Sequence, residues 1–314
     1  MHPELKRQLP TLLNQLAWLL AMLLIYFFVA PGFVGGSAVQ RVVLNAMNLG
    51  IWLFLLVAVF VPIERLFALN RQPILRPNLL VDLGYYFLTG LIPTLVLTIP
   101  IALLAAIARE IVPAGYLLWV AALPVGIKIS GALVIGELGF YWAHRAMHQV
   151  PGLWQWHAPH HEPVRMDWLV NSRAHPIDII FTRMCGLTLV AISGFGSPGA
   201  SGSGRLVFEI VLFASIFWAF LIHANVKWRF GPLEQIISSP RFHHWHHSRD
   251  DHPNHNYASM LPVFDRLFGT YHMPRGAWPP NYGIAPENRP EVLIAARYGL
   301  SAPEAAQTKS EDPA

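Results

Sequence analysis

Charged residues and cysteines are scarce in this chain of 314 residues. Only 13% of the residues are charged, whereas 54% are hydrophobic and the mean hydropathy is +0.41. A soluble domain usually has about a quarter of its residues charged, so this chain lacks the polar surface that contact with water requires. We therefore predict an integral, multi-pass membrane protein.

The absence of several motifs excludes whole classes of binding site and enzyme. The single cysteine, Cys185, excludes an internal disulfide framework, a multi-cysteine zinc site and a cysteine-bound iron–sulfur cluster. No dense basic run is present, so binding to nucleic acid has no support. No Gly-x-Gly-x-x-Gly segment follows a strand pattern, and no Gly-x-Ser-x-Gly elbow of a serine hydrolase occurs.

Long, mostly apolar runs predict an all-α fold with about four to six transmembrane helices. A helix needs about 20 apolar residues to cross a hydrocarbon core of about 30 Å. Prolines interrupt two of the runs. Pro93 and Pro100 in Leu83–Ala108 predict a kink or a re-entrant dip, and Pro124 and Lys128 interrupt Ile111–Gly136. The predicted spans are Leu12–Ala30, Val42–Ile63, Leu83–Ala108, Ile111–Gly136, Ile179–Ile192 and Leu206–Ile222.

Positive charge at the span ends predicts the orientation. Arg65, Arg71 and Arg76 follow the second run, whereas Arg41 stands alone between the first two. The positive-inside rule then places the loop 64–82 in the cytoplasm, and with it the segments 144–178 and 226–314. Since the C-terminus has no retrieval signal, we expect a bacterial inner membrane.

Histidines form three boxes after position 143. On a helix, positions i, i+3 and i+4 fall within an arc of roughly 100°, so each box presents its imidazoles to one point. Eight imidazoles from three places can surround two metal ions, and so many buried imidazoles without a cation would be costly. The boxes are "HRAMH" with His144 and His148, "HAPHH" with His157, His160 and His161, and "HHWHH" with His243, His246 and His247.

The remaining histidines are weaker candidates. His244 lies off the arc of its own box, while His2, His252, His255 and His272 are expected to be ordinary polar residues. Imidazole suits zinc, copper, iron and nickel, so ligand type alone does not decide the metal. The Glu-x-x-His pattern of soluble di-iron bundles is absent. Among these metals, the more specific hypothesis is a pair of iron ions that histidine nitrogens bind beside the membrane.

The boxes and the segments "YWAHRAMH", "SRAHP", "SPRFHHWHH" and "NYASMLPVFDRLFGTY" resemble the fatty acid hydroxylase superfamily, also called the sterol desaturase family. The resemblance covers roughly residues 130–275 and includes the order and the intervals of the motifs. It implies a cytoplasmic helical cap that holds a histidine-bound di-metal site, taken as two iron ions, with zinc possible in purified material. It also implies dioxygen as co-substrate, a ninth ligand at His223 and a tenth at His175. Some members have two histidines near position 223, where this chain has one.

Three further polar residues are candidate catalytic residues. Glu137 lies seven residues before His144, on the same helical face, where a carboxylate can orient a metal-bound imidazole. Tyr141 and Asn225 are predicted to face the centre. Asp178 and Asp265 are additional candidates for orienting imidazoles. The predicted domains are N-terminal transmembrane helices at 1–128, a catalytic domain at 129–275 and a C-terminal tail at 276–314.

The predicted function is dioxygen-dependent hydroxylation of a lipid C–H bond in a sterol-like, isoprenoid or fatty acyl substrate. Since the sequence contains no redox module of its own, we expect a separate electron donor, a ferredoxin or cytochrome-type protein with a nicotinamide-dependent reductase. A lipid desaturase using the same site and a non-enzymatic membrane metal transporter remain alternatives. A zinc-dependent hydrolase is less favoured, because its three protein ligands and open site need far fewer histidines.

Overall fold

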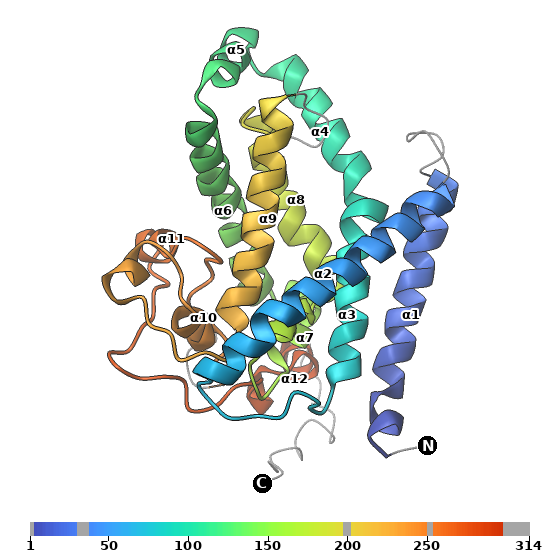
Figure 1. The fold of residues 1–314 in the computed structure, drawn as a ribbon, viewed down its shortest axis with the longest axis vertical. Coiled ribbons are helices and arrows are strands. Elements are labelled where there is room, and N and C mark those ends of the chain that lie inside the picture. Colours follow the sequence, from blue (N-terminus) through green and yellow to red (C-terminus); the bar gives the residue numbers. More distant parts are fainter. Residues whose placement is uncertain (1–2, 30–37, 197–201, 250–253, 298–314) are drawn as a thin grey trace.

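The computed structural model describes residues 3–29, 38–196, 202–249 and 254–297, and all of its regular elements are helices (Figure 1). Only two isolated bridges, Ala68 to Val226 and Ser248 to Tyr282, pair extended backbone within these residues. The prediction of an all-α protein is therefore confirmed. The α-helices are α1 (Pro3–Val29), α2 (Ala38–Phe67), α3 (Leu79–Ile92), α4 (Thr98–Ile111), α5 (Ala114–Ala122), α6 (Val125–Gln149), α7 (Pro151–His161), α8 (Pro176–Ile192), α9 (Ser203–His223), α10 (Pro240–His246), α11 (Val263–Leu267) and α12 (Pro290–Arg297).

Four helices are long and apolar enough to cross a membrane, and a bent pair adds a fifth candidate. The four are Val42–Phe67, Leu79–Leu97, Val125–Gln149 and Ser203–His223. The bent pair consists of Ile99–Ile111 and Ala114–Ala122, which meet at 114°. Four or five spans agree with the predicted number.

Two predicted spans were wrong in detail. The run Ile111–Gly136 is not one helix, because the chain breaks at Leu123 and Pro124 and α6 begins at Val125. The run Ile179–Ile192 belongs to α8, whose 17 residues are fewer than a span needs. The kink predicted at Pro93 is present, since a π-helical segment, η2 (Pro93–Leu97), separates α3 from α4. The predicted span Leu12–Ala30 falls partly outside the described residues.

Glycines bring α6 and α8 into close contact. A Cβ atom added at Gly139 in α6 would lie 2.7 Å from the Cys185 carbonyl oxygen and 2.9 Å from the Gly186 Cα atom, both in α8. A Cβ atom at Gly186 would lie 3.0 Å from the Gly136 carbonyl oxygen. Small residues of this kind allow two helix backbones to approach closely. The short helix α8 is therefore held directly against a membrane-spanning helix.

The C-terminal ends of α2, α6 and α9 lie at one end of the bundle, beside α7, α10, α11 and α12 (Figure 1). These short helices carry most of the histidine boxes. The described part of the predicted tail, residues 276–297, packs against this region: Trp154 Nε1 donates to the Asn288 carbonyl at 2.8 Å, and the Arg249 amide donates to the Asn281 carbonyl at 3.0 Å. The helical cap is thus built from segments on both sides of α9.

The close contact between α6 and α8 predicts that Gly139→Ala destabilises the protein by about 1–3 kcal/mol, the usual range for overpacking. The added methyl group would meet backbone atoms, which cannot rotate away. Thermal unfolding of the purified protein in detergent measures the effect. Gly126→Ala is the matched control in the same helix, because no atom lies within 4 Å of its added Cβ. Equal melting temperatures for the two variants would contradict the contact.

Candidate metal centre

Nine buried histidines form two groups, and within each group the nearest ligand atoms all lie within 4.8 Å of one another. The first group, called group A, has five members and the second, group B, has four. Each group is of the right size to surround one metal ion. Group A is His144, His148, His157, His161 and His246, and group B is His160, His223, His243 and His247.

Each HxxHH box is divided between the two groups. In α7, His157 and His161 belong to group A and His160 belongs to group B, whereas around α10 His243 and His247 belong to group B and His246 to group A. Helix geometry explains the division, because residues i and i+4 lie about 40° apart while residue i+3 lies about 100° from residue i+4. The prediction that a whole box serves one point was therefore wrong for the two HxxHH boxes and is confirmed for HRAMH, because His144 and His148 both belong to group A.

Backbone and carboxylate acceptors fix the tautomers of five imidazoles. His144 Nδ1 donates to the Tyr257 carbonyl at 2.7 Å, and His157 Nδ1 donates to Asp178 Oδ2 at 2.9 Å. The other three donate to main-chain carbonyls: His160 to Arg173, His223 to Ala219 and His246 to His255. Since a neutral imidazole has one N–H, each of these rings turns a bare Nε2 lone pair toward the group. Protein groups of this kind normally orient metal-bound histidines.

Bare nitrogens then face one another. The Nε2 atoms of His144 and His157 are 3.0 Å apart, and those of His160 and His223 are 3.1 Å apart. Neither pair can share a proton, since all four rings carry their hydrogen on Nδ1. Two imidazole nitrogens bound to one ion at about 2.0–2.1 Å would lie about 2.9–3.4 Å apart. The distances therefore fit ligands of a common cation.

Two more nitrogens support the same conclusion. His148 Nε2 and His246 Nε2 are buried, and neither has a hydrogen-bond partner among the described residues. A buried nitrogen without a partner is costly unless a metal ion takes the lone pair. Burial also lowers the pKa of His157 to about 3 and holds the pKa of His160, His161, His243, His246 and His247 well below its usual range. The imidazoles are thus neutral, as metal ligation requires.

An apolar cavity of about 500 Å³ leads from the membrane helices to both groups. Side chains of α2, α3, α8 and α9 form most of its wall, including Leu56, Leu187 and Phe220. Its lining also includes histidines of both groups, namely His144, His157, His160, His223 and His243. An apolar ligand lying between the spans can therefore reach the nitrogen-rich centre without passing through water.

Comparisons with known proteins agree with this geometry. The model of the family described as fatty acid hydroxylase matches residues 129–270. Over 158 residues, the chain is 37% identical to ornithine lipid hydroxylase OlsE from Rhizobium tropici, a match that covers 50% of this chain and 45% of that protein. Over 136 residues, it is 30% identical to alkylglycerol monooxygenase from Homo sapiens, covering 43% of this chain and 28% of that protein.

The match to the fatty acid hydroxylase family thus covers a little less than half of the chain. A third relative is very-long-chain aldehyde decarbonylase GL1-6 from Oryza sativa subsp. japonica, 25% identical over 157 residues that cover 46% of this chain and 23% of that protein. The chain spans less than half the length of these three relatives. No solved structure matches the chain.

Several predicted residues lie outside both histidine groups. His175 caps α8, where its Nδ1 accepts from the Ile177 amide at 3.2 Å, and its ring contacts the rings of Trp18 and Trp156. His244 bonds Tyr282 and the Ala224 carbonyl instead. His255 and His272 are in neither group, and His2 and His252 lie outside the described residues.

The three predicted catalytic residues contact other partners than expected. Glu137 Oε1 accepts from the Met260 and Leu261 amides at 2.6 and 3.2 Å, so it holds a loop although it also lines the apolar cavity. The Tyr141 hydroxyl bonds Thr270 Oγ1 at 2.8 Å. The expectation that Tyr141 and Asn225 face the centre is not met, because their polar atoms bond elsewhere.

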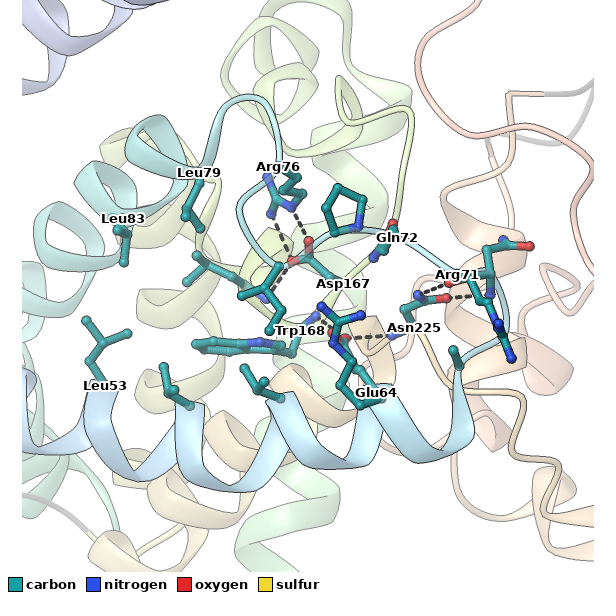
Figure 2. Close-up of a pocket in the computed structure, with 18 residues that line it drawn as sticks. Leu53, Glu64, Arg71, Gln72, Arg76, Leu79, Leu83, Asp167, Trp168 and Asn225 are labelled. Carbon is teal, nitrogen blue, oxygen red and sulfur yellow. Dashed lines mark hydrogen bonds and ion pairs between the residues drawn. The ribbon is translucent and has the colours of Figure 1, made fainter. Parts of the chain in front are cut away.

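Asn225 and the overlooked Glu64 line a second cavity of about 750 Å³ (Figure 2). The Asn225 side chain donates to the Asn70 carbonyl at 2.6 Å and accepts from the Asn70 amide at 3.0 Å. Glu64 Oε1 accepts from the amides of Trp168 and Asn225, each at 2.8 Å. Glu64 thus links α2 to the segment after His223 and to the segment before Arg173. The Arg173 carbonyl in turn orients His160. A carboxylate directly after the uncharged run Val42–Ile63 was the available sequence signal.

Of the two additional carboxylates suggested for orienting imidazoles, Asp178 bonds a histidine directly, whereas Asp265 acts through the backbone of residues 257 and 258. Asp265 accepts from the Tyr257 and Ala258 amides at 2.8 and 2.9 Å, and it thereby holds the loop whose carbonyl orients His144. Burial raises the pKa of Asp265 to about 6.

We predict that Asp178→Ala weakens metal binding about 10- to 100-fold, the usual effect of removing a group that orients a ligand. His157 loses the acceptor that keeps its proton on Nδ1. Metal retained after dialysis against graded chelator concentrations measures the change. Glu209→Gln, an exposed carboxylate on α9, is the control and should retain wild-type metal. Unchanged retention in Asp178→Ala would contradict the orienting role.

Proposed function

We propose that the protein is a membrane-bound, dioxygen-dependent di-iron oxidoreductase that hydroxylates a C–H bond of a lipid. The observation that supports it most strongly is the apolar cavity, because it joins the membrane helices to histidines of both groups. The relatives named above include a lipid hydroxylase and an alkylglycerol monooxygenase. The substrate classes that fit an apolar cavity are sterol-like, isoprenoid or fatty acyl lipids.

In this proposal the nine grouped histidines hold two iron ions, and zinc can replace iron during purification. Nitrogen ligands suit iron, and a pair of irons with dioxygen and two electrons supplies the oxidising power that no side chain has. The protein's own contribution is positional. Asp178 and four main-chain carbonyls keep the ring protons on Nδ1, and the cavity wall holds the lipid chain in a water-poor channel.

The electrons come, in this proposal, from a separate ferredoxin or cytochrome-type protein and its nicotinamide-dependent reductase. We further propose that the histidine groups face the cytoplasm of a bacterial cell. Arg65 lies in the last turn of α2 and Arg71 follows the span Val42–Phe67, and this end of α2 lies at the same end of the bundle as α7 and α10 (Figure 1). Of the predicted catalytic residues, Glu137 alone lines the apolar cavity, and a catalytic role for it stays a prediction.

The two alternative functions, a lipid desaturase and a metal transporter, differ in how well they fit the geometry of the site. A desaturase would use the same centre and remove a second hydrogen, so the geometry suits it equally. A metal transporter binds its cargo near the middle of the membrane between broken helices. Here six of the nine histidines belong to α7, α10 and the residue after α10, outside the candidate spans. That position favours an enzyme.

We predict that His161→Ala, which alters group A, and His247→Ala, which alters group B, each abolish turnover and leave fewer than two metal ions per chain. Each variant opens a coordination site without altering a span. Metal analysis of the purified protein and a turnover assay measure the two effects. His272→Ala is the control, since His272 belongs to neither group. One ion or none in the folded wild-type protein would refute the di-metal centre.

The reaction is tested by comparing the lipids of cells with and without the gene under ¹⁸O-labelled dioxygen. Hydroxylation adds one labelled oxygen to a lipid. Desaturation removes two hydrogens and adds no label, so that result would select the alternative enzyme. An unchanged lipid profile together with altered cellular metal content would favour the transporter.

A further inference from the structure

Arg183 places a positive charge on the wall of the apolar cavity. Seven residues of α8 line this cavity, at spacings that define one face of the helix: Asp178, Ile179, Thr182, Arg183, Gly186, Leu187 and Val190. Arg183 lies in the middle of this stripe. Arg183 itself is partly buried.

Within the part of the chain that the structure describes, no acid is bonded to the guanidinium of Arg183. Among the described residues, it forms no ion pair and no hydrogen bond, although Asp178 attracts it through space. Asp178 is already engaged with its oxygen Oδ2 on His157 Nδ1 at 2.9 Å. The other two acids that line the cavity are also engaged: Glu137 Oε1 accepts from the Met260 and Leu261 amides, and Glu209 pairs with Arg205 at 2.8 Å.

An unpaired arginine beside membrane-spanning helices is costly, and where one occurs it usually has a functional partner. Its planar fork of N–H donors matches the oxygens of a carboxylate or a phosphate. We propose that Arg183 binds an anionic group, a carboxylate or a phosphate, on the lipid that enters this cavity. The inference rests on the proposed function in taking the cavity as the lipid site.

The position of Arg183 and the volume of the cavity indicate the class of ligand more closely. Arg183 follows Asp178 by five residues, which is about 7.5 Å of helix rise, and Asp178 contacts a histidine of group A. The anionic group is therefore held within about two helical turns of the residue that contacts the histidines. A volume of about 500 Å³ suits one small ligand. The ligand is thus a slender anionic lipid that is oxidised close to its charged end.

Photo-cross-linking in nanodiscs of neutral phosphatidylcholine tests the proposal without iron, dioxygen or turnover. The probes are hexadecanoic acid with a diazirine beside its carboxylate, the methyl ester of the same acid, and the corresponding hexadecyl phosphate. Mass spectrometry quantifies the label on the peptide that contains residues 182–187. The proteins are wild type, Arg183→Gln and Arg205→Gln, the last being a control at an exposed arginine of α9.

We expect wild type and Arg205→Gln to take up the acid or the phosphate roughly tenfold more than the ester, the effect of a charge-assisted hydrogen bond, and Arg183→Gln to lose this preference. A stronger signal from the acid or from the phosphate identifies which anion is recognised. Equal labelling by all three probes in wild type overturns the proposal even if Arg183→Gln fails to fold. A preference retained in folded Arg183→Gln also overturns it. If the preference holds while no lipid is oxidised in cells, the proposed reaction fails and the anion site stands.

Discussion

Imidazole nitrogens that face one another without a proton between them are the constraint on which the rest of this structure depends. His144 and His157 approach to 3.0 Å, and His160 and His223 to 3.1 Å, with both rings of each pair protonated on the outer nitrogen. Like lone pairs repel at this distance unless a cation lies between them. The carbonyls, Asp178 and the packed helices around the groups hold the rings against that repulsion.

The helical bundle meets this constraint by bringing several chain segments to one end. Glu64, in the last turn of α2, binds the amides of Trp168 and Asn225, next to the segments that position His160 and His223. Arg76 and Arg173 both pair with the buried Asp82, so the loop before α3 is joined to the loop before α8. Glycines 136, 139 and 186 let α8 approach α6 closely enough for Asp178 to reach His157.

Local patterns in the sequence predicted much of the fold and of the site. The uncharged runs identified the all-α membrane fold, and the three boxes and His223 contain all nine grouped histidines. Which histidine joins which group depends on how α7 and α10 face each other, and no spacing within one helix contains that information. Glu137 and Asn225 had suitable residue types, but a carboxylate or an amide bonds whatever backbone the fold brings near. Arg183 was hidden within an otherwise apolar run, where its charge was the available signal.

The two HxxHH boxes lie on short helices outside the candidate membrane spans. Six of the nine imidazoles come from α7, α10 and the residue after α10, while α6 and α9 supply the other three. Membrane-spanning helices change their tilt when the thickness of the bilayer changes. Such tilting displaces the three imidazoles on α6 and α9. The other six are positioned relative to one another by α7 and α10, two short helices outside the lipid. The spacing between the two groups therefore depends mainly on how α7 packs against α10, and less on the thickness of the membrane in which the protein resides.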